Sequence, residues 1–80
     1  MYKVYILKTD AGNIYIGHTD NLAKRLNSHN QGQNLATQSY NNWKIIYEEA
    51  FESRAMAMSR EKFLKTGDGK KVLKHKGILK

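Results

Sequence analysis

The stretch YKVYILKTDAGNIYIGH, residues 2–18, decides how this 80-residue chain folds. Residues 2–8 and 13–18 are short runs rich in aromatic and β-branched residues, a composition typical of strands. Between them lies the three-residue loop DAG, residues 10–12, which ends in a glycine. Such loops commonly close through a type I turn followed by a left-handed residue. The sequence therefore predicts a β-hairpin.

The loop length also predicts which residues of the hairpin face one another. If Thr9 pairs with Asn13, then Tyr5 faces Gly17. Because side chains alternate between the two faces of a strand, two sets follow. One face carries Tyr5, Leu7, Tyr15 and Gly17, and the other carries Val4, Ile6, Ile14 and Ile16. The two tyrosines become diagonal neighbours, and the glycine opposite Tyr5 is expected to leave room beside them.

Downstream of the hairpin, the sequence predicts a helix and then a loop. Thr19 or Asp20 can cap a helix over residues 20–30, because both side chains can accept a hydrogen bond from the first helical turn. Residues 31–42 are rich in Gln, Asn, Gly and Ser, a composition typical of loops.

The rest of the chain predicts a third strand and two more helices. The run WKIIYEEAF, residues 43–51, is strand-like, and Ser53 can cap a helix that extends to about Lys65. After a glycine-containing break, a short basic helix is expected over residues 68–76. These elements predict one α/β domain over residues 1–80, with a three-stranded antiparallel sheet flanked by helices.

Charge is the clearest compositional signal. Fourteen Lys and Arg residues against seven Asp and Glu residues give a net charge of +7. Residues 65–80 alone hold six lysines and one aspartate. A basic surface of this kind attracts polyanions, nucleic acid first and anionic membranes second. A lysine-rich, solvated tail without a partner is the simpler alternative.

Length and composition further narrow the class of protein. Eighty residues make one domain with a small core. The absence of cysteine favours a reducing compartment, and no apolar run approaches the roughly 20 residues that span a bilayer. The three histidines lack the spacing of a structural zinc site. We therefore expect a cytoplasmic protein that binds nucleic acid and does not enter a membrane.

Glu61 falls on an apolar face of the predicted 53–65 helix. Both faces of this helix carry apolar residues and are expected to be partly buried: Ala57, Met58 and Leu64 beside Glu61, and Met56 and Phe63 opposite. A carboxylate in such a place must be paired or must bind a cation. An ion pair with Lys65, four residues on, or with Arg25 is the purely structural alternative.

Together, the motifs resemble the GIY-YIG domain in its small stand-alone bacterial form. In chain order, the matching residues are Val4-Tyr5 with Ile6-Leu7, Tyr15-Ile16-Gly17, Thr19-Asp20-Asn21-Leu22, Arg25-Leu26 with His29, and Arg60-Glu61-Lys62 with Leu64-Lys65. The resemblance covers essentially the whole chain. Lys3 stands where the family name has glycine, and His18 stands where other members often carry lysine or serine. Related domains occur in homing endonucleases and in the incision subunit of bacterial nucleotide-excision repair, so DNA repair is an implied setting.

The resemblance implies a nuclease that uses one divalent metal, Mg²⁺ or Mn²⁺, on nucleic acid, with DNA favoured. It assigns the metal to Glu61, the phosphate clamp to Arg25, and the orientation or deprotonation of the attacking water to Tyr15. Tyr5 would support Tyr15 or the water, and His29 would tune the tyrosine pair. The chemistry is coherent, because a lone carboxylate suits a hydrated magnesium ion, and the metal and an arginine neutralise charge growing on the phosphate.

Basic residues around this site are expected to contact the nucleic acid: His18, Lys24, Lys65, Lys70, Lys71 and Lys74. Two other functions stay open. A nucleic-acid-binding module of the same fold would keep the basic surface and have little or no cleavage activity. A purely structural domain would make the clustering of tyrosine, arginine, histidine and glutamate a coincidence.

Overall fold

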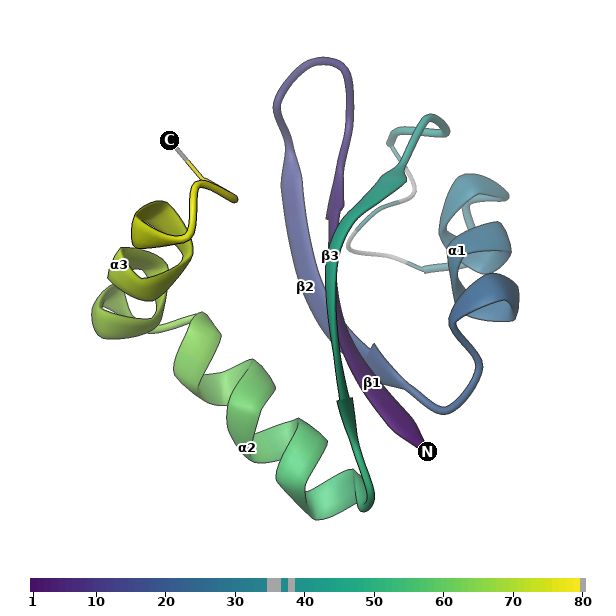
Figure 1. The fold of residues 1–80 in the computed structure, drawn as a ribbon. Coiled ribbons are helices and arrows are strands. Elements are labelled where there is room, and N and C mark those ends of the chain that lie inside the picture. Colours follow the sequence, from purple (N-terminus) through teal and green to yellow (C-terminus); the bar gives the residue numbers. More distant parts are fainter. Residues whose placement is uncertain (35–36, 38, 80) are drawn as a thin grey trace.

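The computed structural model describes residues 1–34, 37 and 39–79, and the described chain forms a three-stranded antiparallel sheet with three helices (Figure 1). The strands are β1 (Tyr2–Lys8), β2 (Ile14–Thr19) and β3 (Lys44–Phe51), in the order β2-β1-β3. The helices are α1 (Leu22–Asn30), α2 (Arg54–Leu64) and α3 (Gly67–His75). The predicted fold class is confirmed. Residues 35, 36 and 38 of the expected loop, and residue 80, lie outside the described residues.

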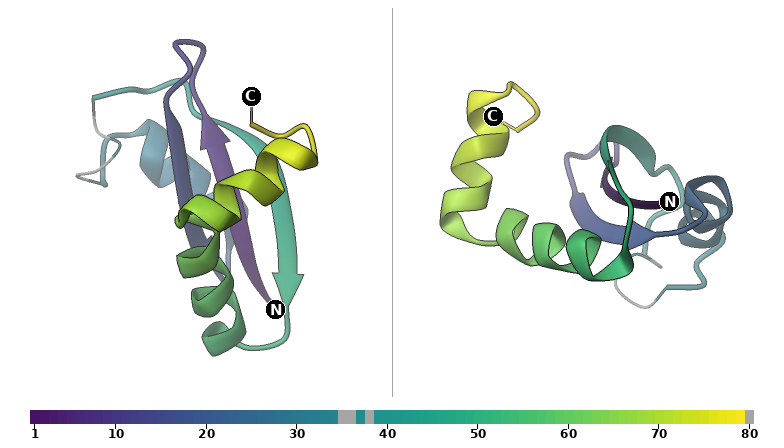
Figure 2. Two further views of the ribbon diagram at one scale, coloured as in Figure 1. Left: turned by 90° about the vertical axis from the view of Figure 1, so that its left-hand side faces the viewer. Right: turned by 60° about the horizontal axis from the view of Figure 1, so that its bottom comes forward.

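The helices cover both faces of the sheet. In Figures 1 and 2, α1 lies on one face, while α2 and α3 lie on the other. Each face has its own hydrophobic cluster. Under α2 and α3 the buried residues are Val4, Ile6, Ile16, Ala57, Leu64 and Leu73. On the α1 face they are Tyr5, Leu7 and Trp43, with Leu22 and Leu26 of α1 packed against them. None of the described helices is long and apolar enough to cross a bilayer.

The hairpin has the register predicted from its loop. Tyr5 pairs with Gly17, and Leu7 pairs with Tyr15. Gly12 has a φ of 91°, the left-handed conformation that a glycine adopts without a steric cost. Because β1 and β2 alternate in step, both tyrosine side chains point to the α1 face, as expected.

The cap of α1 differs from the expected one. Asn21, instead of Thr19 or Asp20, caps the helix, and its Oδ1 accepts a hydrogen bond from the backbone N of Lys24 at 3.2 Å. Thr19 closes the preceding turn, where its hydroxyl accepts from the backbone N of Asn21 at 3.1 Å. The turn therefore consumes the first candidate cap, and the helix begins at Leu22.

The N-caps of α2 and α3 determine where these two helices begin. Ser53 caps α2 as predicted, since its Oγ accepts from the backbone N of Met56 at 3.2 Å. Thr66 caps α3 by accepting from the backbone N of Gly69 at 3.1 Å. A Cβ on Gly69 would collide with the backbone of Phe63. This glycine therefore lets α3 turn closely against the end of α2.

The expectation that both faces of α2 are partly buried is wrong for the outer face. Ala57 and Leu64 are fully buried against the sheet. On the outer face, Met56 and Phe63 are 52% and 37% exposed, and Met58, which the apolar pattern predicts to be partly buried beside Ala57 and Leu64, is also 46% exposed. The reason is that α3 continues from the end of α2 over the sheet and leaves the outer side of α2 uncovered (Figure 2).

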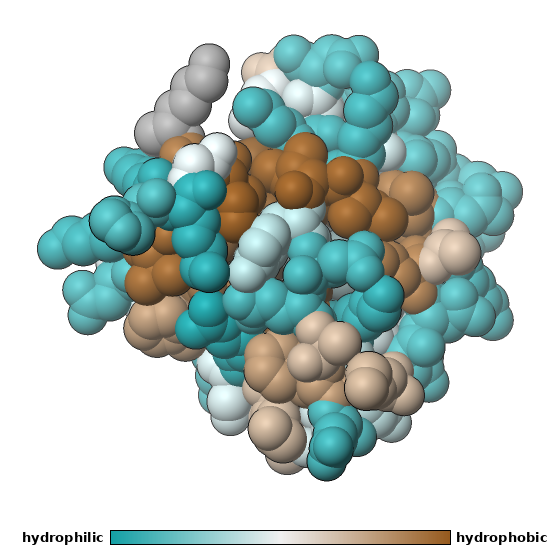
Figure 3. Space-filling view, viewed as in Figure 1, coloured by the Kyte–Doolittle hydropathy of each residue, from teal (hydrophilic) through white to brown (hydrophobic). Residues whose placement is uncertain are grey.

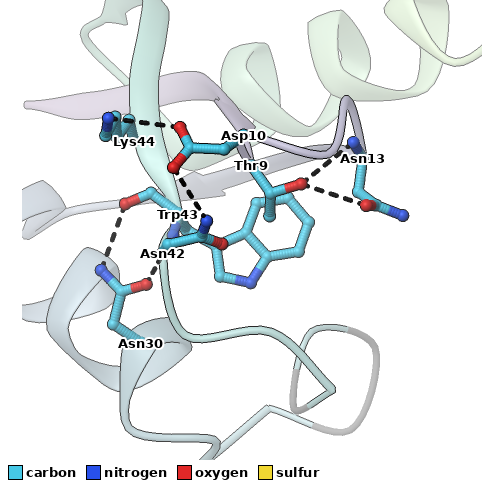
Figure 4. Close-up of polar contacts among 7 residues, drawn as sticks. All are labelled: Thr9, Asp10, Asn13, Asn30, Asn42, Trp43 and Lys44. Atoms are coloured by element: carbon cyan, nitrogen blue, oxygen red, sulfur yellow. Dashed lines mark hydrogen bonds and ion pairs between the residues drawn. The ribbon is translucent and has the colours of Figure 1, made fainter.

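Polar contacts tie the end of α1 to the start of β3 (Figure 4). The Asn30 side chain accepts from the backbone N of Trp43 at 2.7 Å and donates to its carbonyl at 3.2 Å. Asp10 of the hairpin loop accepts hydrogen bonds from Lys44 at 3.3 Å and from Asn42 at 3.2 Å. These contacts fix the buried Trp43 at the border of the α1-side cluster.

Candidate active site

Tyr5 and Tyr15 lie side by side on the α1 face, with 6.2 Å between their ring centroids. Gly17 makes this packing possible. A Cβ there would lie 2.7 Å from the Tyr5 hydroxyl oxygen and 2.9 Å from Cε2 of Tyr15. The room expected opposite Tyr5 is therefore filled by the two tyrosine rings. Tyr5 is buried, whereas Tyr15 is only partly buried.

A series of hydrogen bonds links the Tyr5 hydroxyl to His29 and Thr37. The Tyr5 hydroxyl lies 2.9 Å from Nε2 of the buried His29, and Nδ1 of His29 lies 2.7 Å from Oγ1 of the buried Thr37. The Thr37 hydroxyl donates to the Asn34 carbonyl at 3.4 Å. Because Thr37 has a single hydrogen to donate, His29 Nδ1 must be the donor to it. His29 Nε2 is then the acceptor, and Tyr5 donates to it.

Burial sets the protonation states of this pair. Desolvation lowers the pKa of His29 below its usual value, and the positive charge of Arg25 adds to the effect. Desolvation also raises the pKa of Tyr5 to about 12, although a hydrogen bond with Arg25 opposes the shift. At neutral pH, Tyr5 is therefore a protonated hydrogen-bond bridge and His29 a neutral acceptor. Neither group carries a charge at the centre of the cluster.

Arg25 completes this side of the site from α1. It is exposed on the helix, one turn before His29. Hydrogen bonding with Tyr5 is the main cause of a raised pKa of the guanidinium, and Tyr15 contributes as well. A guanidinium has five N–H donors in a planar fork that matches a phosphate, and contacts with two phenols leave donors available. Arg25 is thus positioned beside both tyrosines with an open side to solvent.

Glu61 approaches β2 from the opposite face of the sheet. Its Oε1 accepts from Nδ1 of His18 at 2.7 Å, and its Oε2 accepts from Nζ of Lys65 at 2.7 Å. Burial acts to raise the pKa of Glu61, but the bonds from Lys65 and His18 outweigh it, and the net pKa is lowered. Glu61 is therefore ionised at neutral pH. Its negative charge also raises the pKa of Tyr5, so the two groups interact across the edge strand.

Of the two ion pairs that the sequence predicted as structural alternatives for Glu61, one is present. The ion pair with Lys65 is present, whereas the contacts of Glu61 in the described residues are with Lys65 and His18 and not with Arg25. Its neighbour Arg60 anchors α2 to β3 by donating to both carboxylate oxygens of Glu49, at 2.8 and 3.0 Å. Such a bidentate pair is geometrically strict and fixes which side of α2 faces β2.

The candidate site offers a divalent metal one carboxylate, that of Glu61. No cluster of three or more acidic, histidine or cysteine side chains that could hold a metal occurs in the described part of the chain. The Glu61 side chain is ionised and 18% exposed, which suits Mg²⁺, an ion that keeps several of its waters. Both of its oxygens accept hydrogen bonds, so a metal would displace Lys65 or His18 from one of them. The donor set fits a hydrated ion and not an all-protein cage.

The structure gathers the predicted site residues into two groups on either side of β2. Tyr5, Tyr15, Arg25 and His29 form the first group, and Glu61, His18 and Lys65 form the second. Lys65, Lys70 and Lys74 line one cavity beside the hairpin. Lys24 and Lys71 are exposed lysines outside these groups.

Thr37 is the residue of the site that the sequence did not reveal. It lies in the region predicted only as a polar loop, yet it is 1% exposed and holds His29 in one tautomer. Its backbone carbonyl also accepts from Nε1 of Trp43 at 3.2 Å. A lone threonine in a loop has no periodic pattern, so its contact with His29 could be found only in three dimensions.

The sequence matches the GIY-YIG catalytic domain family over residues 1–74, and the chain belongs to this family of nuclease domains. It is 41% identical over 66 residues to a UPF0213 protein of Clostridium perfringens, covering 81% of this chain and 71% of the relative. A UPF0213 protein of Staphylococcus saprophyticus is 33% identical over 72 residues, covering 89% and 88% of the two chains. One of Streptococcus agalactiae is 36% identical over 63 residues, covering 78% and 72%. No solved structure matches the chain significantly.

Proposed function

We propose that this protein is a divalent-metal-dependent endonuclease that hydrolyses phosphodiester bonds in nucleic acid, with DNA as the favoured substrate. One observation carries the proposal: Tyr15 and Arg25 meet over the buried Tyr5–His29 pair on one face of β2, and Glu61 reaches the same strand from the other face. Membership of a nuclease domain family supports the reaction type. The net charge of +7 supports a polyanionic substrate.

Tyr15 is the side chain best placed to orient or deprotonate the attacking water. Unlike Tyr5, it is accessible to solvent, and its hydroxyl is not committed to His29. Arg25 lies beside Tyr15 and presents its positive charge to the same space. Tyr5 and His29 act on Tyr15 through packing: the ring centroids of Tyr15 and His29 lie 4.7 Å apart. They position Tyr15, and Tyr5 positions Arg25.

Arg25 would hold a non-bridging oxygen of the scissile phosphate. Its charge would offset the negative charge that develops there in the transition state. Glu61 would hold Mg²⁺ or Mn²⁺, which supplies further neutralisation of the phosphate when bound. Because Glu61 is kept ionised by Lys65 and His18, its charge is available at neutral pH.

A nucleic-acid-binding module with little cleavage is the second candidate function. The observation that favours it is that both Glu61 oxygens already accept hydrogen bonds, from His18 and from Lys65. If these bonds persist in the presence of metal, the domain retains its basic surface and lacks the metal site.

A cleavage assay with matched variants separates the two functions. Purified protein is incubated with end-labelled single-stranded, branched and duplex DNA and RNA in Mg²⁺, Mn²⁺ or EDTA. We expect metal-dependent cleavage that falls about 10²-fold or more in Tyr15→Phe and in Arg25→Met. Arg54→Met is the control, because Arg54 is an exposed arginine of α2 away from the tyrosines. If the protein binds nucleic acid but does not cleave it with any of these metals, its function is that of a binding module and not of a nuclease.

A further inference from the structure

A cavity of about 690 Å³ lies between the β-hairpin and the C-terminal segment. Aliphatic side chains form its floor: Ile14, Ile16, Ile78 and Leu79. Lysines surround it: Lys8, Lys65, Lys70 and Lys74. Figure 3 shows hydrophobic side chains gathered where α3 faces the strands, with hydrophilic side chains around them. The size falls within the range of pockets that hold small organic ligands, about 300–1,000 Å³.

Three of the four lysines around the cavity have no acidic partner among the described residues. Of the ion pairs between described residues, none includes Lys8, Lys70 or Lys74. Lys70 and Lys74 are one helical turn apart, so both ammonium groups lie on the same side of α3. Only Lys65 of the four is paired, to Glu61. The cavity thus combines an apolar floor with a rim of excess positive charge, and its complement is a ligand with an apolar body and phosphate groups.

We propose that this cavity takes one unpaired nucleotide of the substrate strand, with its base on the aliphatic floor and its phosphates on Lys70 and Lys74. The proposal rests on the proposed nuclease function. Lys65 lines the cavity and also pairs with Glu61 of the candidate active site, so a strand that enters the cavity passes Glu61. A paired, stacked base in a duplex cannot reach an apolar floor. The substrate class is therefore nucleic acid with an unpaired segment next to the scissile bond.

Binding assays in EDTA test the proposal without cleavage. Fluorescence anisotropy compares three labelled DNAs: a duplex, the same duplex with a short single-stranded overhang, and that duplex with abasic residues in the overhang. We expect wild-type protein to bind the overhang about five- to tenfold more tightly than the plain duplex. This difference in affinity corresponds to the lower end of the free energy that one base contributes in single-strand-binding proteins. The abasic overhang should lose this preference, because the phosphates remain and the base is gone.

Two pairs of variants locate the effect. Ile14→Thr removes apolar surface from the cavity, and Ile46→Thr is its control, since the two isoleucines are 38% and 37% exposed and Ile46 lies outside the cavity. Only Ile14→Thr should abolish the preference for the overhang. The double change Lys70→Gln/Lys74→Gln should weaken binding and reduce the salt slope by about one unit per lost phosphate contact. Lys62→Gln/Lys76→Gln removes the same charge from exposed positions outside the cavity and should change binding less.

Several outcomes would overturn the proposal. Equal affinity for the duplex and the overhang would do so, as would equal losses in the two isoleucine variants. Binding of phosphatidylglycerol vesicles that needs Lys70 and Lys74, without any preference for the overhang, would assign the cavity to a lipid headgroup. The nuclease function is separately testable: cleavage without preference for the overhang refutes only the cavity assignment, and preference without cleavage in any metal refutes only the nuclease.

Discussion

Tyr5 and His29, 24 residues apart in the chain, meet in a buried hydrogen bond of 2.9 Å between the tyrosine hydroxyl and Nε2 of the histidine. The bond joins the central strand to α1 through two side chains that have almost no contact with solvent. It is also the point at which the site and the stability of the fold depend on the same atoms. Changes here should therefore alter both activity and unfolding, and the two effects can be measured separately.

Tyr5→Phe keeps the ring and removes the hydroxyl that bridges Arg25 and His29. His29 Nε2 then lacks a partner in a buried position, which costs about 1–3 kcal/mol in the free energy of unfolding. Cleavage should fall by more than the folded fraction does, because Arg25 loses the contact that positions it. Chemical denaturation and initial cleavage rates on one preparation test this. Unchanged specific activity of the folded protein would show that Tyr5 has a structural role only.

His29 should make the protein less stable at acidic pH. Its pKa is lowered in the folded state, whereas the unfolded chain has the ordinary value of about 6.5. The unfolded state therefore binds more protons in this window, and stability falls as the pH drops through 6.5 toward the folded pKa. The loss approaches about 1.4 kcal/mol for each unit of the shift.

The variant His29→Gln isolates this contribution, because glutamine can accept and donate hydrogen bonds but does not titrate. Melting temperatures measured between pH 5 and pH 8 should fall less steeply toward acid in the variant than in the wild type. His18 and His75 remain in both proteins, so the difference between the two curves belongs to His29. Parallel curves would contradict the assignment of a lowered pKa.

Gly17→Ala should disturb the tyrosine pair directly. The new Cβ would lie within 3 Å of both rings, and overpacking of this kind costs about 1–3 kcal/mol. We expect a lower melting temperature and loss of cleavage. Gly67→Ala is the matched control: a Cβ there meets nothing within 4 Å, so it should leave stability unchanged or raise it slightly. A fully active Gly17→Ala protein would show that the rings can move apart without consequence.

Glu61→Gln separates the catalytic role of this residue from its ion pairs. The Lys65 side chain is 52% exposed, and pairs of this kind contribute at most about 1 kcal/mol, so the fold should tolerate the change. Cleavage should drop roughly 10²-fold or more if Glu61 holds the metal, and nucleic-acid binding should stay the same or tighten. Glu52→Gln, at an exposed position, is the control. Cleavage that falls only in proportion to folded protein would remove Glu61 from the mechanism.

The parts of the fold that depend on local rules were predictable from the sequence. A three-residue loop ending in Gly12 fixes the hairpin register, and this register alone places Tyr5 and Tyr15 on one face. The α2 cap at Ser53 follows from the same kind of local chemistry. Of the site, Tyr5, Tyr15, Arg25, His29 and Glu61 were recognisable because their order and spacing resemble the family.

The remainder depends on competition and on distant contacts. Thr19 is a good cap, but the turn before α1 uses its hydroxyl first, and Asn21 takes the role. Met58 lies on an apolar stripe, but no element covers that part of α2, so it is exposed. Thr37 becomes part of the site only because the loop returns to His29. None of these outcomes follows from a pattern within a single segment.

The single ammonium group of Lys65 pairs with the Glu61 carboxylate at 2.7 Å, and the same side chain lines the cavity. The carboxylate and a phosphate in the cavity would therefore compete for one positive charge. A phosphate that draws Lys65 into the cavity leaves Glu61 with less compensating charge, and Glu61 then attracts a divalent cation more strongly. Linkage is reciprocal, so a bound cation must increase the affinity for the phosphate by the same factor. Magnesium and nucleic acid would therefore bind cooperatively, and half-saturation with the metal should move to lower concentration as oligonucleotide is added.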